Sequence, residues 1–366
     1  MTIHQIHISD VRNYLKCRRQ WRWTSPLWGN MEPAIPVTYF YFGRAVHHCL
    51  EMKASQDKPF DLSFQEFIKH EDELMAQLDP EMQPRQDQLV EAAELAWSVL
   101  KHYEMHTAWD NGPWSDANLE YLQTETPFQV QLRGRSGRRT DIFLSGRYDG
   151  IVQRKDDKSF WIFETKTTRA IGELERSLDN DLQAGMYIWA AKELQDLPIK
   201  GVLYNMLKKK APTEPQFRTG RGVLQQDKKL ATTPAAYLDA IRRTHPTFED
   251  RHILEYYGEY LQWMVGEPNQ FFKRVAVVRT DFEIEALATD IYDIAREMVS
   301  KYTRIYPSPS WMNCGFCSFR EPCLSLNKGM FDQAELLLRE NYRHKVVAES
   351  LRETESIDTV GGNADA

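Results

Sequence analysis

The spacing of apolar and polar residues predicts that the chain begins with helices. The segment ISDVRNYLKCRRQWRW predicts a short helix capped by Ser9, because its apolar residues recur at helical spacing. The segment YFYFGRAVHHCLEMKAS predicts an apolar entry and then a helix. Residues 61–108 keep the helical period almost throughout, so helix is expected there as well.

The middle of the chain changes to the pattern of strands. Residues 125–168 hold β-branched and aromatic runs separated by the polar turns RGRSGRR and KDDK, which predicts at least three antiparallel strands. A helix is expected from about Asp179 through LQAGMYIWAAKEL, and GVLYNML predicts another strand. Residues 235–304 and 331–352 predict helices on either side of the turn-rich segment WMNCGFCSFREPC. We therefore expect an α/β (α+β) fold, a small mixed sheet flanked by helices.

Composition supports a folded protein without a membrane span. The 366 residues are 42% hydrophobic and 12% aromatic, and no run approaches the roughly 20 apolar residues that span a bilayer. The start MTIHQIHISD lacks the pattern of a secretory signal, so a cytoplasmic protein is expected. The net charge of −7 argues against a uniformly basic surface, but not against a local basic patch. Residues 353–366 carry acids and no base, which predicts a disordered acidic tail.

Two carboxylates inside apolar strands are the main candidates for chemistry. A KDDK turn centred between Asp156 and Asp157 places Asp149 opposite Glu164, with Cβ atoms about 4.5–5.5 Å apart. The two-residue period of a strand puts Lys166 on the same side as Glu164.

Carboxylates at that separation repel each other unless a cation lies between them. Magnesium or manganese, which prefer oxygen ligands, would remove this cost, polarise a phosphoryl oxygen and lower the pKa of a bound water. Lys166 would then hold that water or stabilise the charge that develops on the phosphorane. The alternative is a cross-strand salt bridge on the surface, which the apolar runs IFLSGRYDGIV and FWIFETK disfavour.

Two helical segments carry polar pairs with a spacing of four residues. Gly43 and His47 share one helical face, so His47 is a candidate nitrogen ligand and Gly43 permits close packing. His48 is its immediate competitor and faces about 100° away. Gln183 and Tyr187 also share a face, and both side chains can position a phosphate or a base by hydrogen bonding.

In chain order, the motifs GRAVH, RYDG, ETK and QAGMY resemble those of the RecB-like branch of the PD-(D/E)XK nuclease superfamily, which has a restriction-endonuclease-like core. Tyr148 stands where the superfamily often has proline, a departure that is common in this branch. The resemblance implies roles for six residues: His47, Asp149 and Glu164 as metal ligands, Lys166 with Asp149 and Glu164 as catalytic residues, and Gln183 and Tyr187 as substrate-positioning residues.

Four of the five cysteines strengthen this resemblance. Cys17 stands early, and Cys314, Cys317 and Cys323 form a C-x2-C-x5-C motif. The arrangement resembles iron–sulfur RecB-like nucleases, including AddB-type nuclease domains and CRISPR-associated exonucleases, in which four thiolates hold a 4Fe–4S cluster. By themselves four cysteines suit either such a cluster or a structural zinc. Cys49 lies outside the pattern and is expected to pack within the helix of His47.

The resemblance predicts one nuclease domain over residues 1–352. Its core would comprise 8–51, 125–205 and 310–325, with helical insertions over about 52–124 and 235–304. The expected function is that of a metal-dependent DNA exonuclease that hydrolyses phosphodiester bonds and contains a structural 4Fe–4S cluster. Two alternatives remain at this point: a non-catalytic DNA-binding or assembly protein that retains the nuclease fold, and a zinc-stabilised nucleic-acid-binding module.

Local basic segments suit a DNA partner. Eight lysines and arginines lie within residues 200–229, against Glu214 and Asp227, and four arginines lie in the RGRSGRR turn. The sequence has no G-x-x-x-x-G-K-[ST] motif for ATP. We therefore expect single-stranded DNA or a free DNA end as substrate, or a separate helicase or recombination protein as partner.

Overall fold

The computed structural model describes residues 3–35, 40–77, 83, 85–194 and 197–345. The predicted acidic tail, 353–366, lies outside these residues. The chain divides into two compact units, one comprising Met1–Ile8 and Val37–Ala295 and the other Ser9–Pro36 and Arg296–Ala366. Within the described residues, no helix is both long and apolar enough to cross a membrane.

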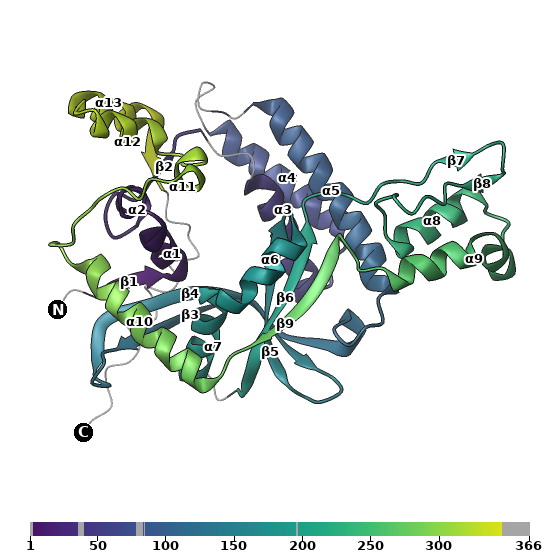
Figure 1. The fold of residues 1–366 in the computed structure, drawn as a ribbon, viewed down its shortest axis with the longest axis horizontal. Coiled ribbons are helices and arrows are strands. Elements are labelled where there is room, and N and C mark those ends of the chain that lie inside the picture. Colours follow the sequence, from purple (N-terminus) through teal and green to yellow (C-terminus); the bar gives the residue numbers. More distant parts are fainter. Residues whose placement is uncertain (1–2, 36–39, 78–82, 84, 195–196, 346–366) are drawn as a thin grey trace. The chain divides into compact units, whose positions relative to one another are not determined.

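A mixed sheet of six strands forms the centre of the first unit (Figure 1). Its strands are β1 (His4–His7), β3 (Leu119–Arg133), β4 (Arg139–Arg154), β5 (Phe160–Thr168), β6 (Ile199–Lys208) and β9 (Phe272–Val278). The order is β1-β4-β5-β6-β9, and β3 also pairs with β4. Strands β3, β4 and β5 follow one another antiparallel, as the two polar turns predict. Strand β6 then runs parallel to β5, which requires a crossover, and helices form it.

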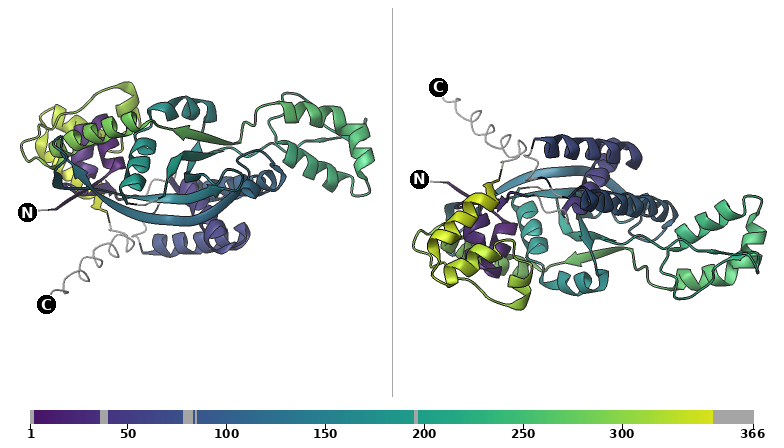
Figure 2. Two further views of the ribbon diagram at one scale, coloured as in Figure 1. Left: turned by 90° about the horizontal axis from the view of Figure 1, so that it is seen from below. Right: turned by 90° about the horizontal axis from the view of Figure 1, so that it is seen from above.

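Helices cover both faces of this sheet, so the α/β fold with a mixed sheet is confirmed (Figure 2). One face carries α3 (Tyr41–Gln56), α4 (Phe60–Ala76) and α5 (Gln86–Trp109). The other face carries the crossover helices α6 (Ile171–Ser177) and α7 (Leu182–Leu194). Nine consecutive residues of α7, Gln183–Ala191, are buried, which explains why LQAGMYIWAAKEL is apolar all round.

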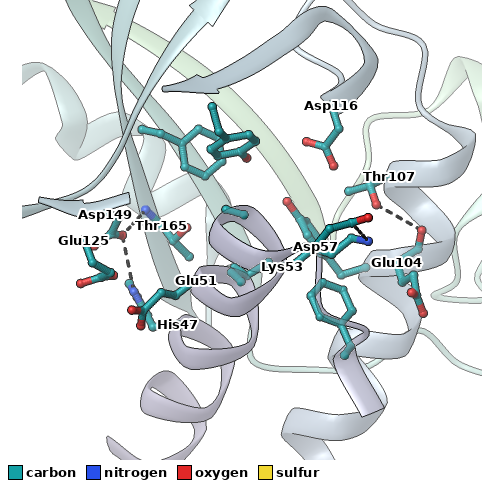
Figure 3. A pocket seen from close by; sticks show the side chains of 16 residues that line it. His47, Glu51, Lys53, Asp57, Glu104, Thr107, Asp116, Glu125, Asp149 and Thr165 are labelled. Atoms are coloured by element: carbon teal, nitrogen blue, oxygen red, sulfur yellow. Dashed lines mark hydrogen bonds and ion pairs between the residues drawn. The ribbon is translucent and has the colours of Figure 1, made fainter. Parts of the chain in front are cut away.

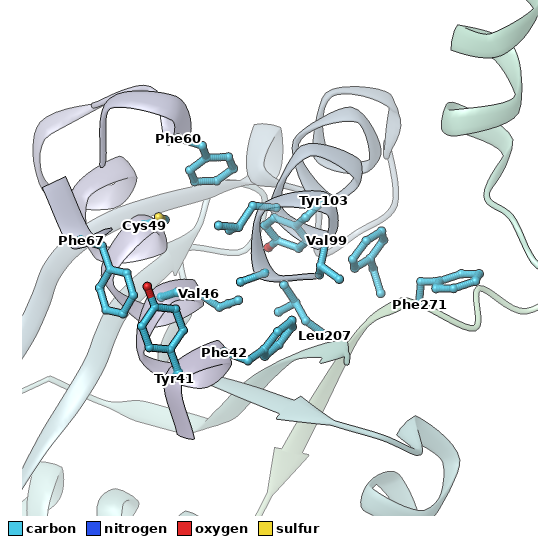
Figure 4. Packing of buried hydrophobic residues seen from close by; sticks show 14 residues of the cluster. Tyr41, Phe42, Val46, Cys49, Phe60, Phe67, Val99, Tyr103, Leu207 and Phe271 are labelled. Atoms are coloured by element: carbon cyan, nitrogen blue, oxygen red, sulfur yellow. The ribbon is translucent and has the colours of Figure 1, made fainter. Parts of the chain in front are cut away.

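A tightly packed hydrophobic core fixes the helices of the first face (Figure 4). Phe42 and Val46 of α3 pack with Val99 and Tyr103 of α5 and with Leu207 at the end of β6. All five side chains are at most 5% exposed. Because burying an apolar side chain stabilises by about 1.5–3 kcal/mol, this cluster holds α3 firmly against the sheet.

The segment between β6 and β9 folds into a small helical module with its own core. It contains β7 (Phe217–Arg218), β8 (Val223–Leu224), α8 (Pro234–Thr244) and α9 (Asp250–Gly266). Helix α8 begins as its sequence dictates, since the Thr233 side chain accepts a hydrogen bond from the Ala236 amide and proline follows at the first helical position. The aromatic side chains of Tyr237, Tyr257 and Tyr260 pack together at its centre.

The second unit is built from the two ends of the chain. Its elements are α1 (Ile8–Lys16), α2 (Arg18–Thr24), β2 (Met31–Pro33), α11 (Trp311–Gly315), α12 (Arg320–Asn327), α13 (Phe331–Asn341) and β10 (Tyr342–His344), and the last residues of α10 (Asp281–Val299) also belong to it. Strands β2 and β10 pair antiparallel. Trp21 is fully buried and meets the rings of Tyr14 and Trp28 edge to face.

Several details of the secondary-structure prediction were wrong. The helix expected over residues 331–352 ends at Asn341, and Tyr342–His344 form β10. Residues 235–304 are not helical throughout, because the β-branched run RVAVV forms β9 at the edge of the sheet. Ser9 does not cap the first helix, since α1 already begins at Ile8. Strands β1 and β2, of four and three residues, were missed because so short a run shows no clear period.

Candidate active site

The site lies where β4 and β5 move apart. The ladder between them pairs Gln153 with Phe160 and ends at the pair of Gly150 and Phe163, which is the register predicted from the turn. Asp149 and Glu164 are next in that register but lie just beyond the ladder rather than in it. The Asp149 carboxylate instead accepts a hydrogen bond of 2.7 Å from the Thr165 amide of β5.

Glu164 is buried and fixed by two donors. Its side chain is attached at one oxygen only: Oε1 accepts hydrogen bonds from Lys166 Nζ at 2.7 Å and from Gln183 Nε2 at 2.9 Å. Lys166 Nζ also donates to Gln183 Oε1 at 2.7 Å. Glu164 Oε2 is buried and has no hydrogen-bond partner among the described residues. A residue only 3% exposed is not part of a surface salt bridge, and a buried carboxylate oxygen without a partner calls for a functional explanation.

His47, rather than His48, faces the carboxylates. His47 Nδ1 lies 3.4 Å from Asp149 Oδ2, and burial lowers the pKa of His47. The imidazole is therefore neutral at pH 7 and keeps a lone pair for a ligand. His48 packs near the ring of Phe67 on another side of α3. A Cβ at Gly43 would make an ordinary contact, 3.5 Å from Thr167 Oγ1, so the packing there does not demand glycine.

Burial and a neighbouring carboxylate raise the pKa of both acids, with Asp149 acting on Glu164 and Glu51 acting on Asp149. Burial and the neighbouring Asp149 raise the pKa of Glu164 to about 7, although Lys166 opposes this shift. Burial also raises the pKa of Asp149, against the hydrogen bond from the Thr165 amide. Two acids whose ionisation is disfavoured in this way form a site that a cation would stabilise.

The polar pair on α7 divides between two tasks. Gln183 lies in the site, bonded to both Glu164 and Lys166. Tyr187 is 6% exposed, and its hydroxyl donates to the Arg147 carbonyl at 3.1 Å. Its hydroxyl also lies within hydrogen-bonding reach of Gln183. In this geometry Tyr187 supports Gln183 and β4.

Two acids that the sequence did not single out complete this end of the site. Figure 3 shows Glu51 and Glu125 beside His47 and Asp149. Glu51 lies one turn beyond His47 on α3, so a search at helical spacing would have found it. Glu125 depends on an irregularity of β3, where its φ of 46° places a non-glycine residue in the left-handed region. Burial raises the pKa of Glu125 to about 7, although Arg147, which forms an ion pair with it, opposes this shift. Asp149 and Glu51 add to the effect of burial.

A cavity of about 350 Å³ extends from these residues along α3 and α5 (Figure 3). Apolar and aromatic side chains, including Leu50, Phe60 and Phe163, form part of its wall. The lining also includes six carboxylates: Glu51, Asp57, Glu104, Asp116, Glu125 and Asp149. So acidic a cavity attracts cations and repels an uncompensated phosphate.

The donors at the site suit a hard divalent cation. Carboxylate oxygens and one neutral imidazole are ligands that magnesium and manganese accept. The buried second oxygen of Glu164, without a partner, fits such a role. Within the described residues, however, no three His, Cys, Asp or Glu side chains are gathered as a complete metal site. His47 and Asp149 are in contact, whereas Glu164 is hydrogen-bonded to Lys166 and Gln183.

The cysteines of the predicted cluster all lie in the second unit. Cys17 falls at the break between α1 and α2, and its Sγ accepts a hydrogen bond from the Ser308 amide at 3.5 Å. Burial raises the pKa of Cys317, and the neighbouring thiols of Cys17 and Cys323 add to this effect. Cys314 is exposed in α11. Three of the four thiols are thus neighbours, although no group of three in the described part of the chain forms a metal site.

Cys49 is fully buried in the core of α3, which confirms the expectation that it packs within that helix (Figure 4). Burial raises the pKa of its thiol to about 12.

The basic segments are partly committed to intramolecular contacts. Arg133 and Arg135 of the turn form ion pairs with Glu193 and Asp293. Lys209 lies over the ring of Phe42, and burial lowers its pKa. These contacts reduce the positive charge that the turn offers to a phosphate backbone.

Comparison with known proteins agrees with the geometry of the site. Residues 6–324 match the model of the PD-(D/E)XK nuclease superfamily. A search of curated proteins found no match. Because the matched region covers most of the chain and includes β4, β5 and α7, the chain belongs to the PD-(D/E)XK nuclease superfamily.

Proposed function

We propose that the protein is a metal-dependent DNA exonuclease of the RecB-like type, which hydrolyses phosphodiester bonds. The observation that carries this proposal is the buried Glu164 carboxylate. One of its oxygens is held by Lys166 and Gln183, and the other has no partner among the described residues. A buried acid in this state, next to the partly exposed acid Asp149, is costly unless it serves a cation.

His47, Asp149 and Glu164 would hold a magnesium or manganese ion. When bound, such an ion supplies Lewis acidity that lowers the pKa of a water and polarises the scissile phosphate. The chain's own residues orient the reaction. The Thr165 amide fixes Asp149, and the α3 core fixes His47.

Lys166 is the proposed catalytic cation. Gln183 and Glu164 hold its ammonium group in one position, so its protons can face charge that develops on the phosphoryl oxygens without reorganisation. Gln183 would act as a positioning residue for Lys166, and Tyr187 would act through Gln183. Both residues would therefore support Lys166 instead of contacting the substrate directly.

We propose in addition that Cys17, Cys314, Cys317 and Cys323 hold a 4Fe–4S cluster that joins the two ends of the chain within the second unit. The proximity of the Cys17, Cys317 and Cys323 thiols supports this proposal. Zinc is the alternative occupant, and the iron and sulfide content of anaerobically purified protein distinguishes the two. Bound zinc without sulfide would overturn the cluster.

The proposed substrate is DNA, single-stranded or with a free end, in the cytoplasm. The sequence contains no motif for ATP hydrolysis, so a duplex would be opened by a separate helicase or recombination protein.

The test is to incubate anaerobically purified protein with end-labelled single- and double-stranded DNA and magnesium or manganese, beside its Glu164→Ala variant. We expect laddering from one end with the wild type only. Circular single strands should resist cleavage, because an exonuclease needs an end. Intact DNA in both lanes would overturn the proposal and favour a DNA-binding protein that retained the fold.

A further inference from the structure

One segment of the second unit exposes an unusual series of aromatic side chains. Tyr302, Trp311 and Phe316 are 84%, 81% and 84% exposed, and Tyr306 between them is 45% exposed. Single exposed apolar residues are common on protein surfaces, but four large rings within fifteen residues are not. None of them belongs to the candidate active site.

The backbone of this segment is anchored, so the exposure of the rings does not come from a loose chain. The Tyr306 carbonyl accepts a hydrogen bond from the Arg19 amide at 3.2 Å. The Asn313 side-chain amide donates to the Lys16 carbonyl at 3.2 Å. Phe319 at the end of the segment is 1% exposed and stacks on Trp23 and Tyr342. The outward rings are thus presented on a fixed support.

The segment itself carries only positive charge, part of which is paired, since Arg320 lies 3.7 Å from Glu321, and Arg18 beside the segment donates to Glu297 at 2.6 Å. Residues 301–320 contain Lys301, Arg304 and Arg320 but no aspartate or glutamate, although the whole chain carries a net charge of −7. Two of the rings have a cation beside them: Lys301 Nζ lies 5.2 Å from the centre of the Tyr302 ring, and Arg18 Cζ lies 5.0 Å from that of Tyr306. Rings interleaved with cations match a ligand that has both flat faces and negative charge.

We propose that residues 301–320 form a binding surface for single-stranded nucleic acid. Unpaired bases would stack on Trp311, Phe316 and Tyr302, and Lys301 and Arg304 would contact the phosphates. Duplex bases are already stacked on each other and do not offer their faces, so the surface selects single strands. The inference rests on the nucleic-acid substrate of the proposed function, but it concerns binding and not cleavage.

The experiment measures binding of a labelled poly-dT oligonucleotide to the full-length protein by fluorescence anisotropy, in EDTA so that metal-dependent cleavage cannot occur. A base stacked on an aromatic ring contributes enough for roughly five- to hundredfold in affinity. We expect the double variant Trp311→Ala/Phe316→Ala to bind at least about tenfold more weakly. Trp311→Phe keeps a ring and should retain most of the affinity. Phe282→Ala, which removes a ring that is 83% exposed on α10, is the matched control and should bind as the wild type does.

Two results would overturn the inference. One is a double variant that binds poly-dT within about twofold of the wild type, or a Phe282→Ala control that loses as much. The other is a duplex that binds as tightly as the single strand and depends equally on the two rings, since stacking of unpaired bases would not explain that. Thermal unfolding of each variant verifies that the fold is intact, as expected for side chains with so few contacts.

The outcome is independent of the cleavage assay. Ring-dependent binding without any cleavage in magnesium or manganese would refute the proposed nuclease and leave this surface standing. Cleavage by a protein whose affinity for poly-dT does not depend on Trp311 and Phe316 would refute only the proposed binding surface.

Discussion

Replacing Glu164 by glutamine should abolish cleavage and, at the same time, stabilise the metal-free protein. The substitution keeps the size of the side chain and an oxygen for Lys166 and Gln183, removes the charge, and replaces the other carboxylate oxygen by an amide NH2 group. Replacing a proposed catalytic residue is expected to stabilise the folded state where the site holds like charges close together.

The magnitude follows from the pKa of Glu164. An unperturbed glutamate has a pKa of about 4.5, and burial beside Asp149 raises that of folded Glu164 to about 7. Between these values the folded state binds more protons than the unfolded state, so stability falls as the pH rises through this window. Each pKa unit corresponds to about 1.4 kcal/mol, so ionised Glu164 costs the folded protein about 3 kcal/mol above pH 7.

The assay is urea unfolding of metal-free protein at about pH 5 and pH 8.5, with wild type and Glu164→Gln compared at each pH. Near pH 5 the two proteins should be nearly equal, because Glu164 is then protonated in the folded state. At pH 8.5 the variant should be more stable by up to about 3 kcal/mol. Glu120→Gln, which changes an exposed glutamate of β3, is the control and should show no such gain.

A gain that is absent at pH 8.5, or equal at both pH values, would refute the reasoning. It would mean that Glu164 ionises in the folded protein without cost, and the argument that the site requires a cation would lose its support. A second readout is metal binding. Manganese should raise the stability of the wild type far more than that of Glu164→Gln, since a ligand that binds only the folded state stabilises it.

Three further substitutions test other parts of the structure. Gly201→Ala should lower the free energy of unfolding by at least about 2 kcal/mol, because its Cβ would overlap the Val277 carbonyl oxygen. The control Gly220→Ala meets no atom within 4 Å and should leave the midpoint of urea unfolding unchanged. His47→Ala should weaken manganese binding at least about tenfold by calorimetry, and an unchanged affinity would remove His47 from the ligand set. Cys317→Ser should reduce bound iron and thermal stability together, and a variant that keeps both would refute the cluster.

The sequence predicted the strand pair of the candidate site well because its information is local. The polar KDDK turn sets the register of β4 and β5, and the two-residue period of a strand then places Lys166 beside Glu164. The spacing of four residues also predicted that Gly43 and His47 share one face of a helix, since this relation is local as well.

Other features depend on tertiary contacts that one sequence does not reveal. Glu125 lies opposite Asp149 in the register of β3 and β4, which pairs Thr124 with Gly150 and Thr126 with Tyr148, and its backbone adopts a positive φ. Strand β9 lies within a largely helical region and is stabilised by pairing with β6, a segment more than sixty residues earlier. From the sequence, the Tyr187 hydroxyl was expected to position a phosphate or a base. Its contact with the Arg147 carbonyl shows that it faces the protein interior. Whether the chain is one domain, as predicted, stays a prediction.

The attachments of the site residues explain why removal of a metal should change stability more than geometry. Each proposed ligand is held by the protein itself: His47 by the packed helix α3, Asp149 by the Thr165 amide, and Glu164 by Lys166 and Gln183. Lys166 bonds only one oxygen of Glu164, and although Arg147 pairs with Glu125, Glu51 adds negative charge nearby. A multivalent cation held by His47, Asp149 and Glu164 would offset the repulsion between the acids. The same preorganisation that keeps the acids close without a metal would therefore favour the binding of one.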